Sequence, residues 1–457
     1  MNRAAQKKET VMERLQRIKT SQRLSGAFAN MPARVLPADS KLHFELEILS
    51  PEIMRNIDEI DVKYVRDDHR MDDGSIARLT PDRELLWQKV PCSVSGNILT
   101  FDLDFNGEHE HWIGISVLED DAEYREDFSF YTLEKDLLKY NVFKGSVHTH
   151  STGSDGNYPP EFVPAYMRQA GYDFTALTDH ACYEPSLQAV EAMKKFDSGL
   201  EVYHGEEAEN YGFGITHILS LGSSASISKW EYDPESDFAA RVEKIQNELK
   251  DYPEHEAKYA AQFEAITSKI RELGGLSVYC HPYWKQNARY AATELMTDII
   301  LRRGNFDALE LGNFTVPRMA LLNAKVMEAI REYQFRKPFI GSSDWHGRPS
   351  QKATVDYTII FADSAEFPDF AEAVRAERCV AVGGQNDEFP FGPYRLVKYA
   401  QFLMEHYFKK IHDPLCAEQG ELILKALNGD TSVLPAIADL KEKIAEKQAE
   451  FFGRGIK

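Results

Sequence analysis

The chain has 457 residues, of which 43% are hydrophobic and 28% charged, and its formal net charge is −20. This length predicts two or more modules, and the negative charge disfavours a nucleic-acid partner, because non-specific affinity for nucleic acid depends on Lys and Arg side chains that neutralise phosphates. The sequence has no apolar run of about 18 residues, as a membrane-spanning helix requires, and no apolar segment typical of a secretory signal. We therefore expect a cytoplasmic protein without a membrane partner, and the five scattered cysteines indicate reduced thiols.

Residues 1–25 are predicted to form a basic helical arm. Lys and Arg outnumber Asp and Glu in this stretch, and Val11, Leu15 and Ile18 lie at helical spacing. A charge run of this kind is usually the solvated face of a helix that packs on its own domain or on a second subunit of a homo-oligomer. The alternative is an arm that binds an anionic surface or a partner.

Residues 35–137 are predicted to form a small all-β, sandwich-like domain. Apolar and polar residues alternate at 42–48 and 98–103, and turns such as Asn106-Gly107 separate these runs. The domain contains the pair His109 and His111, but no further cluster of His or Asp in it would complete a metal shell. We therefore leave this pair out of the candidate site.

Residues 140–395 alternate between strand and helix patterns. Strands are predicted at 142–147, 174–177, 200–203, 215–221, 276–279, 308–311, 338–341 and 357–361, and long helical patterns lie around 237–273 and 317–334. About seven or eight such units predict an α/β fold with a closed or distorted barrel rather than an open sheet. Residues 396–457 are predicted to be a helical C-terminal extension without chemistry of its own.

Candidate metal ligands in this domain follow the predicted strands. Barrel enzymes carry their catalytic groups there, because the loops after the strands converge at one face of the barrel. Two pairs, His148 with His150 and Asp344 with His346, have a spacing of two, which puts both side chains on one face of an extended chain. The full set is His148, His150, Asp155, Asp179, His180, Glu206, Glu207, His217, His281, Asp344 and His346.

Several of these residues have ordinary structural interpretations when each is taken singly. Asp179 and His180 are equally well explained as a capping pair, and His217 as a satisfied core histidine. Adjacent carboxylates such as Glu206 and Glu207 repel each other in a partly buried place unless a cation neutralises them, so one of the two is expected to bridge cations while the other faces solvent. So many imidazoles and carboxylates at the strand ends of one domain together predict a multinuclear metal site.

Around these candidate ligands, the sequence resembles the polymerase and histidinol phosphatase (PHP) family. The matching segments are residues 145–156, Thr178-Asp179-His180, Gly205-Glu206-Glu207, Cys280-His281-Pro282 and residues 310–313 and 341–346. The resemblance covers about 140–390 and implies a distorted (βα)7 PHP barrel. Two positions depart from the family pattern, Ser146 before the paired histidines and Trp345 between Asp344 and His346.

The resemblance also implies two or three divalent cations per chain, commonly zinc, manganese or iron. One cation would bind His148, His150, a strand-end glutamate and Asp344, and a second would bind that glutamate, His217 and His281. Asp155, His180 and His346 would hold the third. The family pattern selects Glu207 as the shared glutamate, with Glu206 as the alternative.

The predicted function is a metal-dependent hydrolase, first of all a phosphoesterase that acts on a small molecule through a metal-bridged hydroxide at a di- or trinuclear site. Asp344 and His180 are the predicted catalytic residues, with His180 as the acid or base. Lys285, Arg289 and Arg318 are the predicted contacts of a substrate phosphate.

Two alternatives remain open. A carboxyl-ester, carbamate or amide hydrolase would use the same site, and the aromatic side chains of Tyr283, Trp284 and Trp345 would suit an aromatic substrate. A metal-binding module without turnover is the other alternative, which the nearly complete ligand set disfavours.

Overall fold

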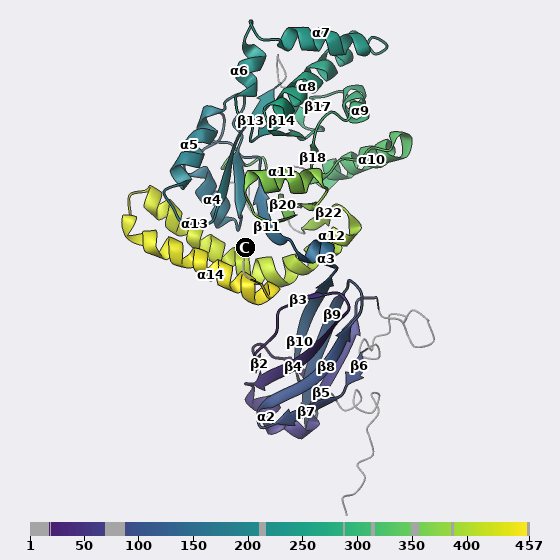
Figure 1. Cartoon of the computed structure of the whole chain (residues 1–457), viewed down its shortest axis with the longest axis vertical. Coiled ribbons are helices and arrows are strands. Elements are labelled where there is room, and N and C mark those ends of the chain that lie inside the picture. The colour runs from purple at the N-terminus through teal and green to yellow at the C-terminus, as the bar shows by residue number, and fades with distance from the viewer. Residues whose placement is uncertain are drawn as a thin grey trace, which may run out of the picture. The chain divides into compact units, whose positions relative to one another are not determined.

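The computed structural model describes residues 18, 20–68, 87–209, 216–286, 288–311, 316–348, 356–384 and 388–454 (Figure 1). It divides into two compact units, one formed by residues 1–139 and 448–456 and the other by residues 140–447 and 457. Within the described ranges, no helix combines the length and the apolar character that crossing a bilayer requires.

The first unit contains two β-sheets. One has the strand order β1 (Thr20–Arg23), β10 (Ala122–Leu133), β9 (Glu110–Glu119), β5 (Asp61–Arg66) and β6 (Gln88–Val90), with β3 (Val35–Pro37) also paired to β10. The other has the order β2 (Phe28–Ala29), β4 (Ser40–Ile48), β8 (Ile98–Phe105) and β7 (Cys92–Ser95). Two short helices, α2 (Pro51–Arg55) and α3 (Lys135–Leu138), belong to the same unit.

Side chains of the two sheets form one apolar core. Every second residue of β8 is buried, as expected for a strand with one face on the core. Phe101 of β8 stacks on Phe44 of β4 with ring centroids 4.5 Å apart, and both pack in the same cluster as Ile115 and Phe130 of the other sheet. The unit is therefore a β-sandwich.

Two predictions about the N-terminal region have different outcomes. The helical arm predicted for residues 1–25 falls mostly outside the described residues, but its last part is a strand, because Thr20–Arg23 pairs in parallel with β10. His111 is buried, with its two ring nitrogens 2.8 Å from Tyr64 Oη and 2.9 Å from Thr132 Oγ1. Burial lowers the pKa of His111 to about 3, so this histidine belongs to the core of the sandwich.

The second unit is built on a ten-stranded sheet. The strand order is β19 (Phe339–Gly341), β18 (Ala308–Leu311), β15 (Leu276–Tyr279), β14 (His217–Leu221), β13 (Glu201–Glu209), β12 (Phe174–Leu177), β11 (Asn141–Ser146), β20 (Tyr357–Ala362), β21 (Cys379–Gly383) and β22 (Phe389–Phe391). β11, β12 and β13 are parallel, as are β15, β18 and β19. β14 and β20 run antiparallel to both of their neighbours, and β22 runs antiparallel to β21.

The sheet is a nearly closed barrel. The backbone N–H of Gly341 in β19 donates to Thr358 Oγ1 of β20 at 3.0 Å, and β19 also contacts β21. A Cβ atom at Gly341 would lie 2.2 Å from the carbonyl oxygen of Tyr357, so this close approach requires glycine. Buried side chains such as Val278 and Ile360 pack in the interior.

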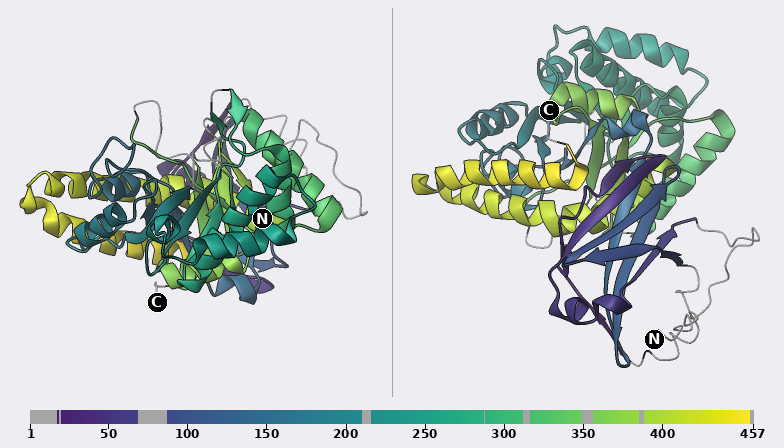
Figure 2. Two further views of the ribbon diagram at one scale, coloured as in Figure 1. Left: turned by 90° about the horizontal axis from the view of Figure 1, so that it is seen from above. Right: turned by 60° about the horizontal axis from the view of Figure 1, so that its bottom comes forward.

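Helices cover the outside of this sheet (Figures 1 and 2). They are α4 (Val163–Gln169), α5 (Glu184–Met193), α6 (Ile227–Tyr232), α7 (Phe238–Glu248), α8 (Glu254–Glu272), α9 (Glu294–Arg303), α10 (Val316–Tyr333) and α11 (Phe367–Arg375). No described helix joins β13 to β14 or β19 to β20. The expected α/β barrel is present, but the regular alternation that (βα)7 implies is not confirmed.

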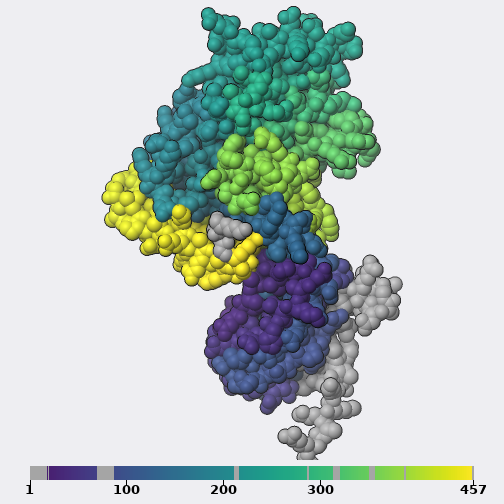
Figure 3. Space-filling view, viewed as in Figure 1, coloured from purple at the N-terminus to yellow at the C-terminus, as the bar shows by residue number. Residues whose placement is uncertain are grey.

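The C-terminal helices pack on the barrel helices. They comprise α12 (Tyr394–Leu403), the π-helical stretch η3 (Met404–His412), α13 (Asp413–Leu427) and α14 (Leu434–Phe452). Gln419 of α13 accepts a hydrogen bond from Arg168 of α4 at 2.7 Å and donates one to the Ile437 carbonyl of α14 at 2.7 Å. Figure 3 shows the yellow C-terminal helices against the segment that carries α4 and α5.

A buried ion pair joins η3 to the residue before β12. Asp173 accepts hydrogen bonds from His412 Nε2 at 2.8 Å, from Arg168 Nη1 at 3.1 Å and from the Lys144 backbone N–H at 3.1 Å. Burial alone would raise the pKa of Asp173, but His412 and Arg168 lower it to about 2. Burial also disfavours the charge on His412, yet Asp173 raises the pKa of His412 well above its ordinary value.

Candidate metal centre

Backbone pairing brings together the two motifs whose side chains are spaced by two. His148 and His150 follow β11, whereas Asp344 and His346 follow β19. Thr149 and Trp345, the middle residues of the two motifs, form a parallel bridge, and the His150 N–H donates to the Trp345 carbonyl at 2.8 Å. The bridge brings all four side chains to one place. Alternation along an extended chain accounts for His148 and His150, whereas Asp344 departs from extended backbone, with a φ of 47°.

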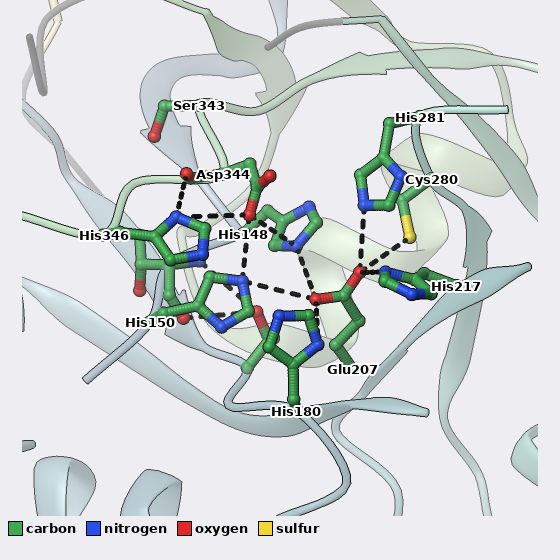
Figure 4. Close-up of polar contacts among 12 residues, drawn as sticks. His148, His150, His180, Glu207, His217, Cys280, His281, Ser343, Asp344 and His346 are labelled. Carbon is green, nitrogen blue, oxygen red and sulfur yellow. Dashed lines mark hydrogen bonds and ion pairs between the residues drawn. The ribbon is translucent and has the colours of Figure 1, made fainter. Parts of the chain in front are cut away.

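The carboxylate of Glu207 lies at the centre of five histidines (Figure 4). Its Oε1 is 2.7 Å from His217 Nδ1 and 2.9 Å from His281 Nε2. Its Oε2 is 3.1 Å from His148 Nε2, 3.3 Å from His150 Nε2 and 3.1 Å from His180 Nδ1. Each oxygen therefore faces a different group of imidazoles, as a carboxylate that bridges two cations does.

Asp344 lies next to His148 and His150, two of the three histidines that surround Oε2 of Glu207. Its Oδ1 is 3.2 Å from His148 Nε2 and 2.9 Å from His150 Nε2. Asp344 and His281 both adopt positive φ angles, 47° and 28°, which residues other than glycine rarely do. Backbone strain of this kind gathers at functional sites, where the surrounding structure compensates for it.

A third group of side chains lies at the exposed edge of the centre. Asp155 Oδ1 is 3.1 Å from His346 Nε2, 3.7 Å from His180 Nε2 and 3.9 Å from His150 Nδ1. The side chain of Asp155 is 48% exposed, whereas that of Glu207 is fully buried. The third group is therefore looser than the other two, and His150 links it to Asp344 through its two ring nitrogens.

The charges of the centre fit a cation. Burial would raise the pKa of Glu207, but the histidines, His148 first, hold it well below its ordinary value. Burial would lower the pKa of His150, but hydrogen bonds to Asp344 and Glu207 raise it to about 9. Protons on histidines such as His148 and His150 thus balance the buried carboxylates, and divalent cations would supply the same positive charge.

Buried polar atoms that lack hydrogen bonds also support a cation at this centre. His148 Nε2, His180 Nδ1 and Glu207 Oε2 are buried and have no hydrogen bond of good geometry within the described structure. Buried polar atoms are normally hydrogen-bonded, so a group of three without such bonds calls for a ligand that the protein atoms do not provide. His148, His150, Glu207 and Asp344 form one buried group with ligand atoms close enough to share a cation.

Glu206, the alternative to Glu207, faces away from the centre. Its carboxylate accepts a hydrogen bond from Ser226 Oγ at 3.1 Å and others from the backbone N–H groups of Ile227 and Ser228 at the start of α6. Burial raises its pKa. Glu207 is therefore the glutamate of the centre. The expectation that the second glutamate faces solvent is wrong, because the start of α6 covers and binds its carboxylate.

Asp179 supports the centre without joining the grouped side chains. Its Oδ1 accepts a hydrogen bond from the Ser151 backbone N–H at 2.8 Å, and its Oδ2 accepts one from the Ser151 hydroxyl at 2.6 Å. These bonds hold the loop that follows His150. Asp179 is therefore a structural residue, whereas its neighbour His180 contacts Glu207.

Three residues of the centre were not on the predicted ligand list. Glu310, at the end of β18, accepts hydrogen bonds from His148 Nδ1 at 2.8 Å and from the His281 backbone N–H at 3.0 Å, so it orients two candidate ligands. Cys280 Sγ lies 3.5 Å from Glu207 Oε1, and Glu209 Oε1 lies 2.9 Å from His180 Nδ1. Glu310 and Cys280 could have been predicted as residues of the centre, because both lie at strand ends within segments that match the family.

The predicted substrate contacts are not among the grouped side chains. Lys285 and Arg289 lie on a small hairpin formed by β16 (Lys285–Gln286) and β17 (Arg289–Tyr290). Lys285 Nζ lies over the Tyr290 ring, 5.0 Å from its centroid. The side chain of Arg318 lies outside the described residues. A guanidinium that does approach the centre is that of Arg348, whose Nη2 is 3.2 Å from Asp155 Oδ2.

One curated relative matches part of the chain. Over 212 residues the chain is 25% identical to the DNA polymerase/3'-5' exonuclease PolX of Bacillus subtilis (strain 168), a match that covers 45% of this chain and 35% of that protein. The chain thus spans about a third of the length of this relative. No family model matches the chain.

Two solved structures share part of the fold. A two-domain protein of Bacteroides vulgatus ATCC 8482, described as containing a PHP-like metal-dependent phosphoesterase, is 17% identical, with a TM-score of 0.41 over 57% of this chain and 69% of that chain. A protein of Bifidobacterium adolescentis ATCC 15703, described as a metal-dependent phosphoesterase, is 18% identical, with a TM-score of 0.32 over 45% of this chain and 88% of that chain. The chain resembles the PHP family. At these identities the likeness concerns the fold alone.

Proposed function

We propose that the protein is a metal-dependent hydrolase that cleaves phosphate esters of small molecules. The observation that supports this proposal most strongly is the fully buried Glu207 carboxylate, with nitrogen atoms of five histidines between 2.7 and 3.3 Å from its oxygens. A structural ion pair needs one or two such contacts. A shared carboxylate with imidazoles on both sides is the arrangement that two adjacent cations require.

Two groups of residues would hold the first two cations, with zinc, manganese and iron as the candidate metals. The first comprises His148, His150 and Asp344 and the second His217 and His281, with Glu207 shared between them. Divalent cations held there would supply Lewis-acid charge and lower the pKa of water. A third cation would use Asp155, His180 and His346, a looser group that favours weaker occupancy.

The side chains at the exposed edge have their own roles in the proposed reaction. His180 keeps a 25% exposed ring, with Nδ1 close to Glu209 and Glu207. Where the third cation is not bound, Nε2 of His180 can give a proton to the leaving oxygen; where that cation is bound, the cation would neutralise the leaving oxygen instead. Arg348 carries a 53% exposed guanidinium beside Asp155. Its planar group of donors suits a pair of phosphate oxygens, and we propose it as the substrate contact in place of Lys285 and Arg289.

The test is phosphate release from a panel of phosphomonoesters and phosphodiesters by metal-free protein and by protein loaded with zinc, manganese or iron. We expect metal-dependent turnover that the Asp344→Asn variant loses by at least about a hundredfold, as the loss of a charged metal ligand should. The exposed Asp251 provides a matched Asp251→Asn control with unchanged activity. Equal activity of Asp344→Asn and Asp251→Asn would refute the assignment.

A carboxyl-ester, carbamate or amide hydrolase is the second candidate, and one aromatic side chain supports it. The ring of Trp284 lies 5.5 Å from that of His217 and 6.2 Å from that of His281, where it could contact an aryl group. Tyr283 and Trp345 give no such support, because they are only 3% and 5% exposed. Faster cleavage of aryl esters than of aryl phosphates would favour this candidate. Metal-induced stabilisation without hydrolysis would favour a binding module.

A further inference from the structure

We propose that Cys280 is a fourth, thiolate ligand of the second cation, beside His217, His281 and Glu207, and that it makes this position select zinc-like, thiophilic metals. The inference rests on the metal centre proposed above. It concerns a side chain that neither the motifs nor the comparisons assign to the metal.

The register of β15 places the thiol of Cys280 in the barrel interior, at the metal centre. Leu276 and Val278 of β15 face the barrel interior, and Cys280 belongs to the same interior cluster, so it continues the inward register one step beyond the strand. The next residue would then face outward. The positive φ of His281, 28°, interrupts the alternation of the strand and brings the imidazole of His281 to the same place as the thiol.

The contacts place Cys280 Sγ among the ligand atoms of the second group. Sγ lies 3.5 Å from Glu207 Oε1, the oxygen that also contacts His217 and His281. Figure 4 shows the sulfur and the two imidazoles directed to this one oxygen. The residue is 1% exposed. A cation near Oε1 would therefore have the sulfur within reach.

Two further observations point to a ligand here. A cavity of about 10 Å³ is lined by His217, Cys280, His281 and Trp284, among others, so a small space adjoins three of the four proposed ligands. His148, Cys280, His281 and Glu310 also have ligand atoms within 4.8 Å of one another, and all four are buried.

The donor set has a chemical consequence. One carboxylate oxygen, two imidazole nitrogens and one sulfur are a four-donor set of the kind that zinc accepts in tetrahedral geometry. Thiolate sulfur is a soft ligand that favours zinc over manganese and magnesium. When the cation binds, the S–H bond breaks, the sulfur–metal bond forms, and the proton leaves to solvent. No electron is transferred in this step.

Cobalt(II) titration of the metal-free, full-length protein tests the inference. We expect a near-ultraviolet sulfur-to-cobalt charge-transfer absorption that grows with bound cobalt, is present in the wild-type protein and is lost in Cys280→Ser. Cys379, buried in the same barrel with Sγ 3.4 Å from the Phe339 carbonyl, provides the matched variant Cys379→Ser, which should keep the absorption. Zinc affinity should fall at least about tenfold in Cys280→Ser, with a smaller change for manganese.

The outcomes separate this inference from the proposed function. Cobalt binding without a charge-transfer band in the wild-type protein would overturn the thiolate ligand and leave the metal centre standing, with Cys280 as a hydrogen-bond donor to Glu207. Absence of cobalt binding, measured by elemental analysis, would overturn both. The wild-type spectrum keeps the inference falsifiable even if Cys280→Ser fails to fold.

Discussion

The buried ion pair between Asp173 and His412 should contribute measurably to the stability of the second unit. Asp173→Asn removes the negative charge that faces His412 and Arg168, and it leaves the remaining hydrogen bonds to a neutral amide. The pKa of Asp173 falls from 3.8 to about 2 on folding, and a difference of this size corresponds to about 2–3 kcal/mol. We therefore expect the variant to lose about this much unfolding free energy at pH 6.

The pH dependence of this loss follows from the two pKa directions. The contribution of Asp173 is fully present above its unfolded pKa and disappears as the pH falls towards 2. The contribution of His412, whose pKa is raised in the folded protein, is fully present below its unfolded pKa of about 6.5 and disappears as the pH rises through the folded value. The difference between wild type and Asp173→Asn should therefore be largest near about pH 5–6 and smaller on both sides.

Urea unfolding of metal-free protein at acidic, near-neutral and alkaline pH measures this difference, and hydrogen exchange of peptides from β12 and α13 assigns it to the second unit. Asp197, whose side chain is 67% exposed and pairs with Lys441, gives the control Asp197→Asn, with an expected loss below about 0.5 kcal/mol. A loss for Asp173→Asn that equals the control near pH 6, or that does not change with pH, would refute the reasoning.

Three further predictions concern the metal centre. Glu207→Gln should abolish high-affinity metal binding in isothermal titration calorimetry, whereas Glu206→Gln, on the neighbouring residue, should retain it; equal affinities would place the bridging carboxylate elsewhere. Glu310→Gln should weaken metal binding about 10–100-fold, because Glu310 orients His148 and the chain at His281, and an unchanged dissociation constant would contradict this role. Arg348→Ala should raise KM for a phosphomonoester more than it lowers kcat, whereas Lys285→Ala should leave both unchanged. The reverse pattern would favour Lys285 as the substrate contact, as the sequence predicted.

The sequence predicts the centre well where the spacing of residues decides the geometry. His148 and His150 lie together because alternation along an extended chain needs no knowledge of the rest of the fold. The spacing also paired Asp344 with His346, but the positive φ of Asp344 is a local feature that the spacing does not reveal. The choice between Glu206 and Glu207 is different. The two residues point to opposite faces of β13, and the sequence alone does not say which face is the interior until β13 is paired with its neighbours.

Other predictions depended on contacts that the sequence does not contain. Lys285 was expected at a substrate because it follows His281 by a few residues, but its direction is set by the hairpin and by the Tyr290 ring. The antiparallel strands β14 and β20 have the same apolar patterns as parallel strands, so periodicity could not distinguish them from βα units. At the end of the predicted N-terminal helix, Thr20–Arg23 pairs instead with a distant strand of the sandwich, an interaction that no local signal reveals.

The bridge between Thr149 and Trp345 joins two segments that are far apart in the sequence and are therefore synthesised at different times. His150 and Asp344 are 194 residues apart in the chain, so a growing polypeptide carries half of its first metal group long before the other half is synthesised. A cation held by both would crosslink this long loop and would stabilise the closed barrel by restricting the unfolded chain. Binding of the first cation and closure of the barrel would therefore favour each other.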